Sequence, residues 1–161
     1  MATGKTKLFP ILEAERTVIK ITNELRGYTK IKVCGSIRRQ KLQVGDIDIV
    51  VCPDGDSSTL IDSIHELGDR VLASGTKLVR VMVGKIQADF YLCEERLYGS
   101  HVLFLTGSKW FNIKCRASAK NMGYRLSQYG LLDGEGKEIA VDENDILEAL
   151  SLQRFMNPST R

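Results

Sequence analysis

The sequence predicts an α+β fold, in which a mixed β-sheet with helices is followed by a smaller α+β lobe. Apolar residues at helical spacing and strand-like alternating runs follow one another along the first part of the chain. Gly84-Lys85 joins two of these runs as a two-residue hairpin turn, so some strands are expected to be antiparallel. The composition changes near Leu97, which places the expected lobes at residues 1–97 and 98–161.

Two helices are expected in the first lobe because each shows one apolar stripe. Gly27 should end the first helix and Gly68 the second, since glycine is common just beyond a helix. A serine in "PDGDSS" supplies the N-cap signal of the second helix. The stripes are Ile11, Ala14, Val18, Ile21 and Leu25 in the first helix, and Leu60, Ile61, Ile64 and Leu67 in the second.

Strands are predicted for four β-rich runs, "KIKVCG", "GDIDIVVC", "TKLVRVMV" and "IQADFYLC", which begin at residues 30, 45, 76 and 86. In the second run Ile47, Ile49 and Val51 share one face, while Asp46 and Asp48 begin the other face. In the fourth run the alternation makes Asp89 a third carboxylate that projects from a strand.

The second lobe is expected to be helical over residues 98–123, with a break at residues 106–108. Ser108 suits the N-cap after the break, and Gly123 suits the end of the helix. Residues 124–141 predict two short strands around residues 133–136, and residues 142–152 predict a closing helix.

The composition is that of a soluble globular protein, with 43% apolar and 27% charged residues. A net charge of +3 permits a nucleic-acid partner but is too small to identify one. We expect an intracellular protein without a membrane partner, because no apolar run resembles a signal peptide or a membrane span. The four cysteines lack zinc-type spacing and are expected as reduced thiols, although three lie in predicted strands, where a close pair could form.

The three strand aspartates indicate a site for divalent metal ions. Asp46 and Asp48 point the same way and can share an ion, and Asp89 would add a third ligand if its strand lies beside theirs. Carboxylate and phosphate oxygens are the ligands that Mg²⁺ prefers, and a pair of such ions supports phosphoryl transfer. The alternative for the bare Asp-x-Asp pair is a solvated strand end.

Residues just before the aspartates could hold a phosphate chain. The Gly35-Ser36 turn offers backbone N–H groups and a hydroxyl, and the guanidinium groups of Arg38 and Arg39 suit phosphate oxygens. Gly45 permits close approach of the backbone to a ligand. Taken alone, the Arg-Arg pair could equally be surface charge.

The segment "GSIRRQKLQVGDIDIVV" resembles the signature of the nucleotidyltransferase superfamily and, in its extended form, of the family X DNA polymerases of the polymerase beta type. The later segment "LFLTGSKWFNIKCRASAKNMGYRLSQYGLLD" resembles the nucleotide-selecting subdomain of those enzymes. The resemblance implies a nucleotidyltransferase palm at 1–97 and that subdomain at 98–161. The chain is similar to the small viral family X enzymes, because one helix is all that is expected before the palm.

The resemblance also implies roles for individual residues. Asp46 and Asp48 would bind two Mg²⁺ ions, for which Mn²⁺ can substitute, and Asp89 would bind only the catalytic ion. The expected nucleotide-binding residues are Gly35, Ser36, Arg39 and Gly45 at the phosphates, Phe104, Leu105 and Gly107 at the sugar, and Asn112 at the minor groove of the nascent base pair. Arg116 would face the same minor groove as a DNA-binding residue. Two positions depart from the family, because Gln87 replaces an arginine and Val44 replaces a small polar residue.

Helical spacing supports part of this assignment independently. Lys109, Asn112, Arg116 and Lys120 form one polar stripe, and Trp110, Ile113 and Ala117 form an apolar stripe on another face. For the two lysines the alternative is an ordinary solvated helix face. The candidates for contact with the DNA backbone are Lys30, Lys32, Arg38, Lys41, Lys109, Lys114 and Lys120, so few that DNA binding should be weak and salt-dependent.

The expected function is that of a monomeric, metal-dependent DNA polymerase that adds deoxynucleotides from dNTPs to a primer, with short-gap filling in DNA repair as its role. A nucleotidyltransferase that acts on RNA, protein or a small molecule is the first alternative. A non-catalytic nucleic-acid-binding module is the second, and the three carboxylates argue against it because they would repel phosphate.

Overall fold

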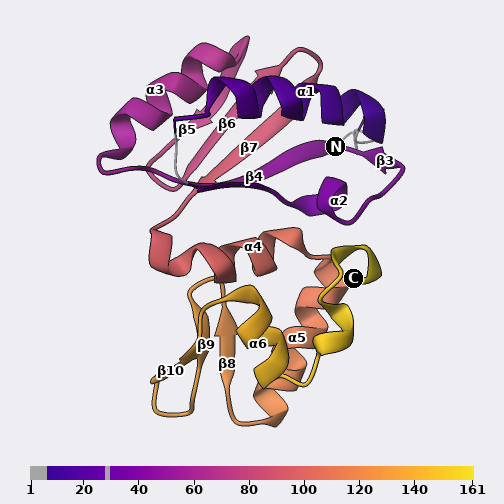
Figure 1. Ribbon diagram of the computed structural model, residues 1–161, viewed down its shortest axis with the longest axis vertical. Helices are drawn as coiled ribbons and strands as arrows, with labels where there is room; N and C mark the ends of the chain where they lie inside the picture. The colour runs from indigo at the N-terminus through magenta and orange to yellow at the C-terminus, as the bar shows by residue number, and fades with distance from the viewer. Residues whose placement is uncertain (1–6, 28–29) are drawn as a thin grey trace, which may run out of the picture.

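Two lobes lie on opposite sides of helix α4 (Tyr98–Thr106) in the computed structural model, which describes residues 7–27 and 30–161 (Figure 1). The first lobe holds a five-stranded sheet, and the second holds a three-stranded sheet with two further helices. The α+β fold class is therefore confirmed. The boundary between residues 97 and 98 stays a prediction.

The five-stranded sheet is mixed, as expected. Its order is β2 (Lys30–Val33), β4 (Asp46–Cys52), β7 (Ile86–Leu92), β6 (Leu78–Val83) and β5 (Arg70–Ser74). Strands β4 and β7 are parallel, and the other neighbouring pairs are antiparallel. The hairpin between β6 and β7 turns at Gly84, whose φ of +61° fits the expected type II′ turn.

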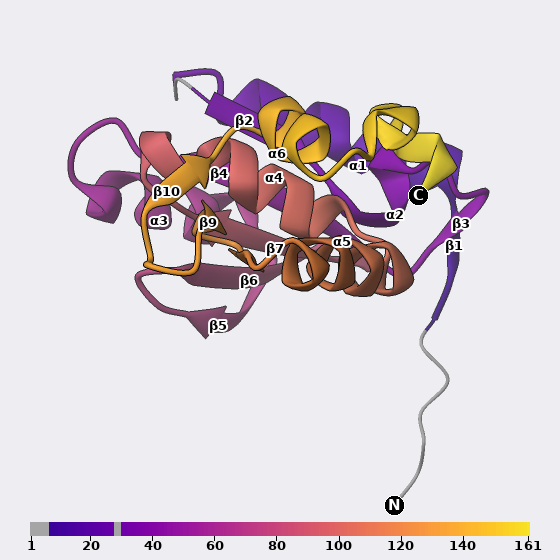
Figure 2. The ribbon, with the colours of Figure 1, turned by 90° about the horizontal axis from the view of Figure 1, so that it is seen from below.

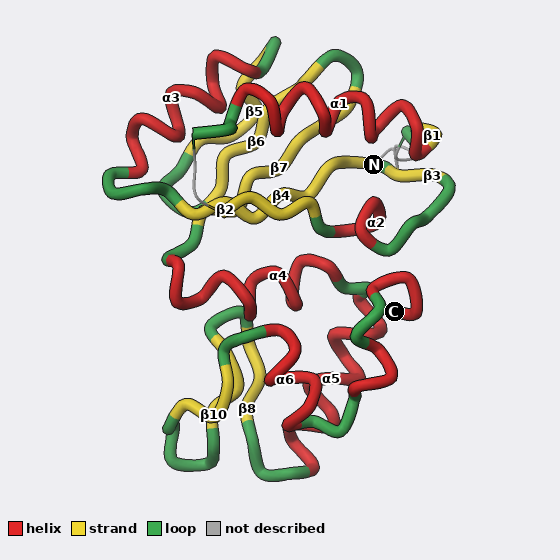
Figure 3. The backbone as a smooth tube through the Cα atoms, viewed as in Figure 1, coloured by secondary structure: helices red, strands yellow, loops and turns green. Residues whose placement is uncertain are grey.

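Helices α1 (Ile11–Glu24) and α3 (Ser57–Leu67) cover one face of this sheet (Figure 3). Ile47 and Ile49 of β4 are fully buried in the core beneath them. Burial of one such side chain contributes about 1.5–3 kcal/mol, and a one-residue slip of β4 would bury its aspartates instead. Hydrophobic burial therefore fixes the register that turns Asp46 and Asp48 toward the second lobe.

Several short elements of the first lobe were not predicted. Strand β5 is exposed along its whole length, so its sequence carries no alternating apolar signal. Phe9–Pro10 (β1) pairs with Gln43–Val44 (β3), and the expected turn at Gly35-Ser36 opens the one-turn helix α2 (Gly35–Arg38). Asp56, not a serine, caps α3, and α1 ends at Glu24, before Gly27.

The second lobe breaks where the sequence predicts. Helix α4 ends at Thr106, and α5 (Lys109–Asn121) begins after Ser108, whose Oγ accepts a hydrogen bond from Phe111 N at 3.3 Å. Gly123 has a φ of +75° just beyond α5, as expected of a helix end.

The two strands expected around residues 133–136 are present in this lobe, and a third strand precedes them. They are β8 (Arg125–Ser127), β9 (Gly130–Leu132) and β10 (Glu138–Ala140), followed by α6 (Glu143–Ala149) and the 3₁₀ turns Gln153–Phe155 and Pro158–Thr160. The additional hairpin turns at residues 128–129, and Gly130, with a φ of +113°, opens its second strand.

Helix α4 packs against both lobes and lies between α5 and α6 when the molecule is seen from below (Figure 2). Its Val102 joins Cys34, Val50 and Cys52 in a small cluster on the first lobe, while Leu103 belongs to the core of the second lobe. A helix that is apolar around its circumference is expected to be buried in this way.

All four cysteines are free thiols. Cys52 Sγ lies 3.7 Å from Cys93 Sγ, so two of the strand cysteines do form a close pair. Within residues 7–27 and 30–161, no helix is both long enough and apolar enough to cross a membrane.

Candidate active site

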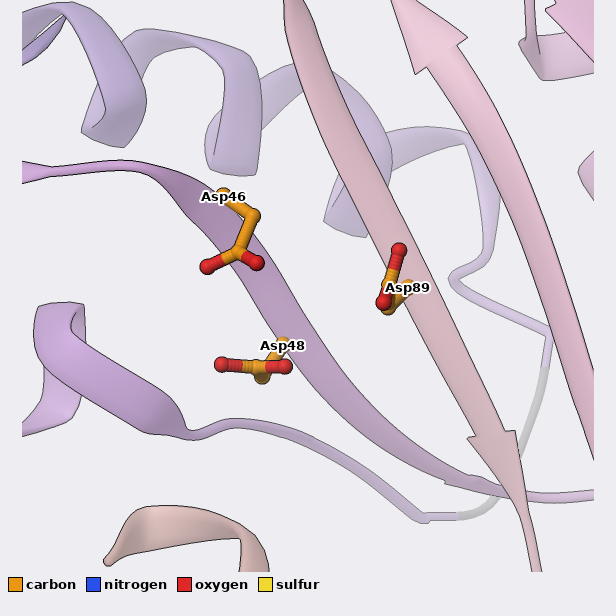
Figure 4. A group of neighbouring side chains, drawn as sticks. All are labelled: Asp46, Asp48 and Asp89. Carbon is orange, nitrogen blue, oxygen red and sulfur yellow. The ribbon is translucent and has the colours of Figure 1, made fainter. Parts of the chain in front are cut away.

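Three carboxylates converge on the open face of the sheet. Asp46 and Asp48 project from the beginning of β4, and the parallel register places Asp89 of β7 opposite Asp48. Ligand oxygens of the three side chains lie within 4.8 Å of one another, and Figure 4 shows them on the same side of the two strands. Such a group of hard oxygen donors could hold divalent metal ions.

The carboxylates destabilise one another in the absence of a cation. Burial, followed by repulsion from Asp46 and Asp89, raises the pKa of Asp48 to about 7. Burial and then Asp89 likewise raise the pKa of Asp46. Tyr91 Oη donates a long hydrogen bond of 3.5 Å to Asp48 Oδ1, which offsets only part of this cost. A divalent cation would relieve the repulsion directly.

Asp89 is 2% exposed and is held by a guanidinium fork that the sequence analysis missed. Arg80 of β6 donates from Nε at 2.8 Å and from Nη2 at 2.6 Å, and Gln87 adds a hydrogen bond of 2.9 Å. Gln87 stands where the family usually has an arginine, but Arg80 on the neighbouring strand still brings an arginine into contact with Asp89. The two-residue turn at 84–85 was the available signal, because it sets the hairpin register that pairs position 80 with position 89.

The residues that are expected to bind the phosphates lie beside the carboxylates. Gly35 has a φ of +57°, and a Cβ on it would lie 2.1 Å from Asp48 Oδ2, so only glycine fits there. Arg39 Nη1 donates to the Thr106 carbonyl oxygen. Among the described residues no group bonds to the buried Arg39 Nε, which leaves one donor of the guanidinium free for an anion.

A cavity of about 380 Å³ connects these groups with the second lobe. It brings together motifs that are about 60 residues apart in the sequence, and Asn112 Nδ2 closes one side with a 2.7 Å hydrogen bond to the Phe104 carbonyl. The lining residues are Gly35, Ser36, Arg39, Asp46, Asp48, Phe104, Leu105, Gly107, Ser108, Lys109, Asn112 and Arg116.

The structure places other predicted residues away from this cavity. Arg38 turns to the second lobe, where it forms a double hydrogen bond with Glu143, both at 2.7 Å, and a third with Thr106. Lys41 and Lys120 are exposed outside the cavity lining, and Gly45 directly precedes β4. Val44 pairs with Phe9 and is buried, so its side chain is unavailable to a phosphate.

Helix α5 presents three different faces. Phe111, Cys115 and Ala119 are buried in the core of the second lobe. Lys109, Asn112 and Arg116 face the cavity. The apolar stripe at Trp110, Ile113 and Ala117 is exposed to solvent.

Comparison with known proteins identifies the family. Residues 11–125 match the family model described as DNA polymerase beta palm, and residues 101–161 match the DNA polymerase beta thumb. The chain belongs to the family X DNA polymerases. It is 34% identical over 139 residues to "DNA polymerase/3'-5' exonuclease PolX" of Bacillus subtilis (strain 168), covering 81% of this chain and 24% of that protein. Over 118 residues it is 30% identical to DNA polymerase lambda of Rattus norvegicus, covering 61% of this chain and 21% of that protein.

A solved structure supports the same fold for this family X chain. This chain is similar to the solved structure of Leishmania infantum polymerase beta in a ternary P/T complex, with a TM-score of 0.78 and 20% sequence identity. That likeness covers 96% of this chain and 77% of the other. The chain spans only about a quarter of the length of the curated relatives that it matches.

Proposed function

We propose that this family X chain is a DNA-directed DNA polymerase, which transfers a deoxynucleoside monophosphate from a dNTP to a primer 3′-hydroxyl and releases pyrophosphate. The observation that carries the proposal is the single cavity in which two sequence motifs meet beside three carboxylates. Short-gap filling in DNA repair, on gapped DNA or a primer-template, is the proposed role.

The carboxylates would hold two Mg²⁺ ions, or Mn²⁺ in their place. Asp46 and Asp48 would hold both ions, and Asp89 only the catalytic one. When bound, such ions lower the pKa of the attacking hydroxyl and neutralise the charge of the triphosphate. The raised pKa values of Asp46 and Asp48 fit this proposal, because the ionised carboxylates repel one another unless a cation lies between them.

Other side chains would position the nucleotide. Arg39, with its free Nε, and Ser36 would bind phosphate oxygens, with the Gly35 and Gly45 backbone beside them. Asp89 would receive the proton of the 3′-hydroxyl on a carboxylate oxygen, while Arg80 keeps the side chain in its orientation. Positioning of this kind accounts for a large share of the rate in phosphoryl transfer.

The second lobe would select the nucleotide. Phe104, Leu105 and Gly107 would lie under the sugar, with Phe104 close to the position where a 2′-hydroxyl would clash. Asn112 and Arg116 would face the minor groove of the nascent base pair. The hydrogen bond from Asn112 to the Phe104 carbonyl supports this arrangement, because it ties the base-facing helix to the sugar-facing turn.

A larger cleft of about 820 Å³ is the proposed path of the DNA. It shares Phe104 and Leu105 with the nucleotide cavity and is lined by Tyr91 of the palm and Tyr129 of the second lobe. Lys30 and Arg38 have carboxylate partners, Glu95 at 2.8 Å and Glu143 at 2.7 Å, so they contribute little to DNA binding. The remaining proposed contacts with the backbone are Lys32, Lys41, Lys109, Lys114 and Lys120.

Few phosphate contacts should make the affinity for DNA low, and the affinity should still fall as salt rises because the contacts are electrostatic; the protein is proposed to act as a monomer. A tight complex that is insensitive to salt would contradict this.

Extension of a one-nucleotide gap with dNTP and Mg²⁺ tests the proposal. The unaltered protein should extend the primer, and Asp46→Asn or Asp89→Asn should abolish extension. Asp62→Asn is the matched control, because Asp62 is an exposed aspartate on α3, on the covered face of the sheet. Absence of extension by the unaltered protein, or undiminished extension by the Asp46 and Asp89 variants, would defeat the proposal. Transfer to RNA, protein or a small molecule but never to the primer would do the same.

A further inference from the structure

The exposed stripe of α5, formed by Trp110, Ile113 and Ala117, leaves apolar side chains in water beside the proposed active site. Trp110 is 77% exposed and Ile113 is 39% exposed. The core of the second lobe is already closed by the opposite face of the helix, so the stripe is not needed for folding. An exposed indole next to an isoleucine is a surface suited to contact with a partner.

This stripe borders the residues that line the nucleotide cavity. A helix turns by about 100° per residue, so Ile113 lies about 60° around the helix from Arg116, and Trp110 about 60° farther on. Because Lys109, Asn112 and Arg116 line the cavity, a base pair held there would have Ile113 and then Trp110 on its outer side.

The charge of α5 favours one class of partner. The helix carries Lys109, Lys114, Arg116 and Lys120 and has no acidic residue between positions 109 and 121. A phosphate backbone is attracted to such a helix. Stacking on an aromatic ring suits a strand of variable sequence, because every nucleobase has a π-face.

We infer that the exposed stripe is a stacking platform for an unpaired base of the template strand, the one immediately beyond the base that pairs with the incoming nucleotide. This inference rests on the proposed function and deepens it. Trp110 stacks on the unpaired base, and Ile113 covers the space between that base and the nascent pair. The unpaired template strand is thereby held in one direction as it leaves the site.

Trp110 is the single tryptophan of the sequence, so its fluorescence reports on the platform directly. The probes are dideoxy-terminated primer-templates in Mg²⁺ without nucleotide, whose template extends beyond the primer by one base or by two. A third probe has an abasic site at the second position. The second base should quench the fluorescence and tighten binding by about tenfold, and the abasic site should abolish both effects.

Variants separate stacking from folding. Trp110→Ala should remove the advantage of the second base, measured by anisotropy of labelled DNA, and Trp110→Phe should keep part of it. Leu12→Ala is the control, because Leu12 is 67% exposed on α1, away from the cavity. Equal affinity of the unaltered protein for the intact and abasic overhangs would overturn the inference. A dimer that depends on Trp110 would also overturn it, since the stripe would then meet a second copy.

The binding assay involves no turnover, so its outcome is independent of extension. Stacking without extension would defeat the proposed polymerase and leave the platform, whereas extension with no effect of the second base would do the reverse.

Discussion

Removing the charge of Asp48 should stabilise the metal-free protein and abolish its activity. Burial and the neighbouring carboxylates raise the pKa of Asp48 from its ordinary 3.8 to about 7. Between these two values the folded chain binds more protons than the unfolded chain, so the free energy of unfolding falls as pH rises through this window. A difference of about 3 pKa units corresponds to about 4 kcal/mol, which is the upper limit of the cost above pH 7.

Asp48→Asn should therefore raise the free energy of unfolding at pH 8 by about 2 kcal/mol, half of the limit, because the buried amide still has to be desolvated. For a chain of this length that corresponds to a rise in Tm of about 4–8 °C. Thermal unfolding in EDTA, followed by circular dichroism, measures the change.

The pH dependence of the gain identifies its cause. At pH 5 the solution has passed only part of the interval between the unfolded and folded pKa values of Asp48. The gain in the free energy of unfolding on Asp48→Asn should therefore fall to less than half of its value at pH 8. Asp62→Asn, which neutralises an exposed aspartate, should leave Tm unchanged at both pH values. A variant that is no more stable than the unaltered protein at pH 8, or one that gains equally at pH 5, would refute the reasoning.

Three further predictions follow from the contacts around the site. Arg80→Met should lower the free energy of unfolding, measured in urea, by about 1–3 kcal/mol with EDTA and by less with Mg²⁺, because the cation then neutralises the buried Asp89 carboxylate. Equal losses with EDTA and with Mg²⁺ would count against this. Glu143→Gln, which breaks the buried double hydrogen bond between the lobes, should lower the free energy of unfolding by about 3 kcal/mol in the same measurement. The control Glu138→Gln, which loses an exposed ion pair, should lower it by less than about 1 kcal/mol. Gly35→Ala should lower single-nucleotide extension by about 100-fold or more, because its Cβ would displace Asp48 Oδ2, one of the oxygens proposed to bind a metal ion. Gly136→Ala shares the positive φ but meets no atom within 4 Å and lies outside both proposed binding cavities, so it should retain activity; similar losses in both variants would point to backbone strain alone.

The sequence predicts those parts of the site that depend on local periodicity. Alternation along one strand is enough to place Asp46 and Asp48 together, and the glycine and serine signals locate the break between α4 and α5. The convergence of Asp89 with them depends on β4 and β7 being neighbours, and only the resemblance to a known family supplied that pairing.

Partners that are distant in the chain lie beyond such reasoning. Arg38 has a neighbour of identical type, and nothing in the sequence shows that Arg38 and not Arg39 contacts Glu143, which is 105 residues from Arg38. Strand β5 was missed because an exposed edge strand needs no apolar face. The exposure of Trp110 is equally invisible, since spacing defines a stripe but not the face that the core covers.

Helix α4 links the packing of both lobes to the cavity that is proposed to bind the nucleotide. One side of the helix seals the palm through Val102, another enters the core of the second lobe through Leu103, and the next residues, Phe104 and Leu105, line the nucleotide cavity. A substitution that reshapes the proposed sugar site therefore changes a helix that packs against both lobes. Conversely, looser packing in either core should change the shape of that site. The molecule should accordingly melt as one cooperative unit, and discrimination between nucleotides should deteriorate before the structure itself is lost.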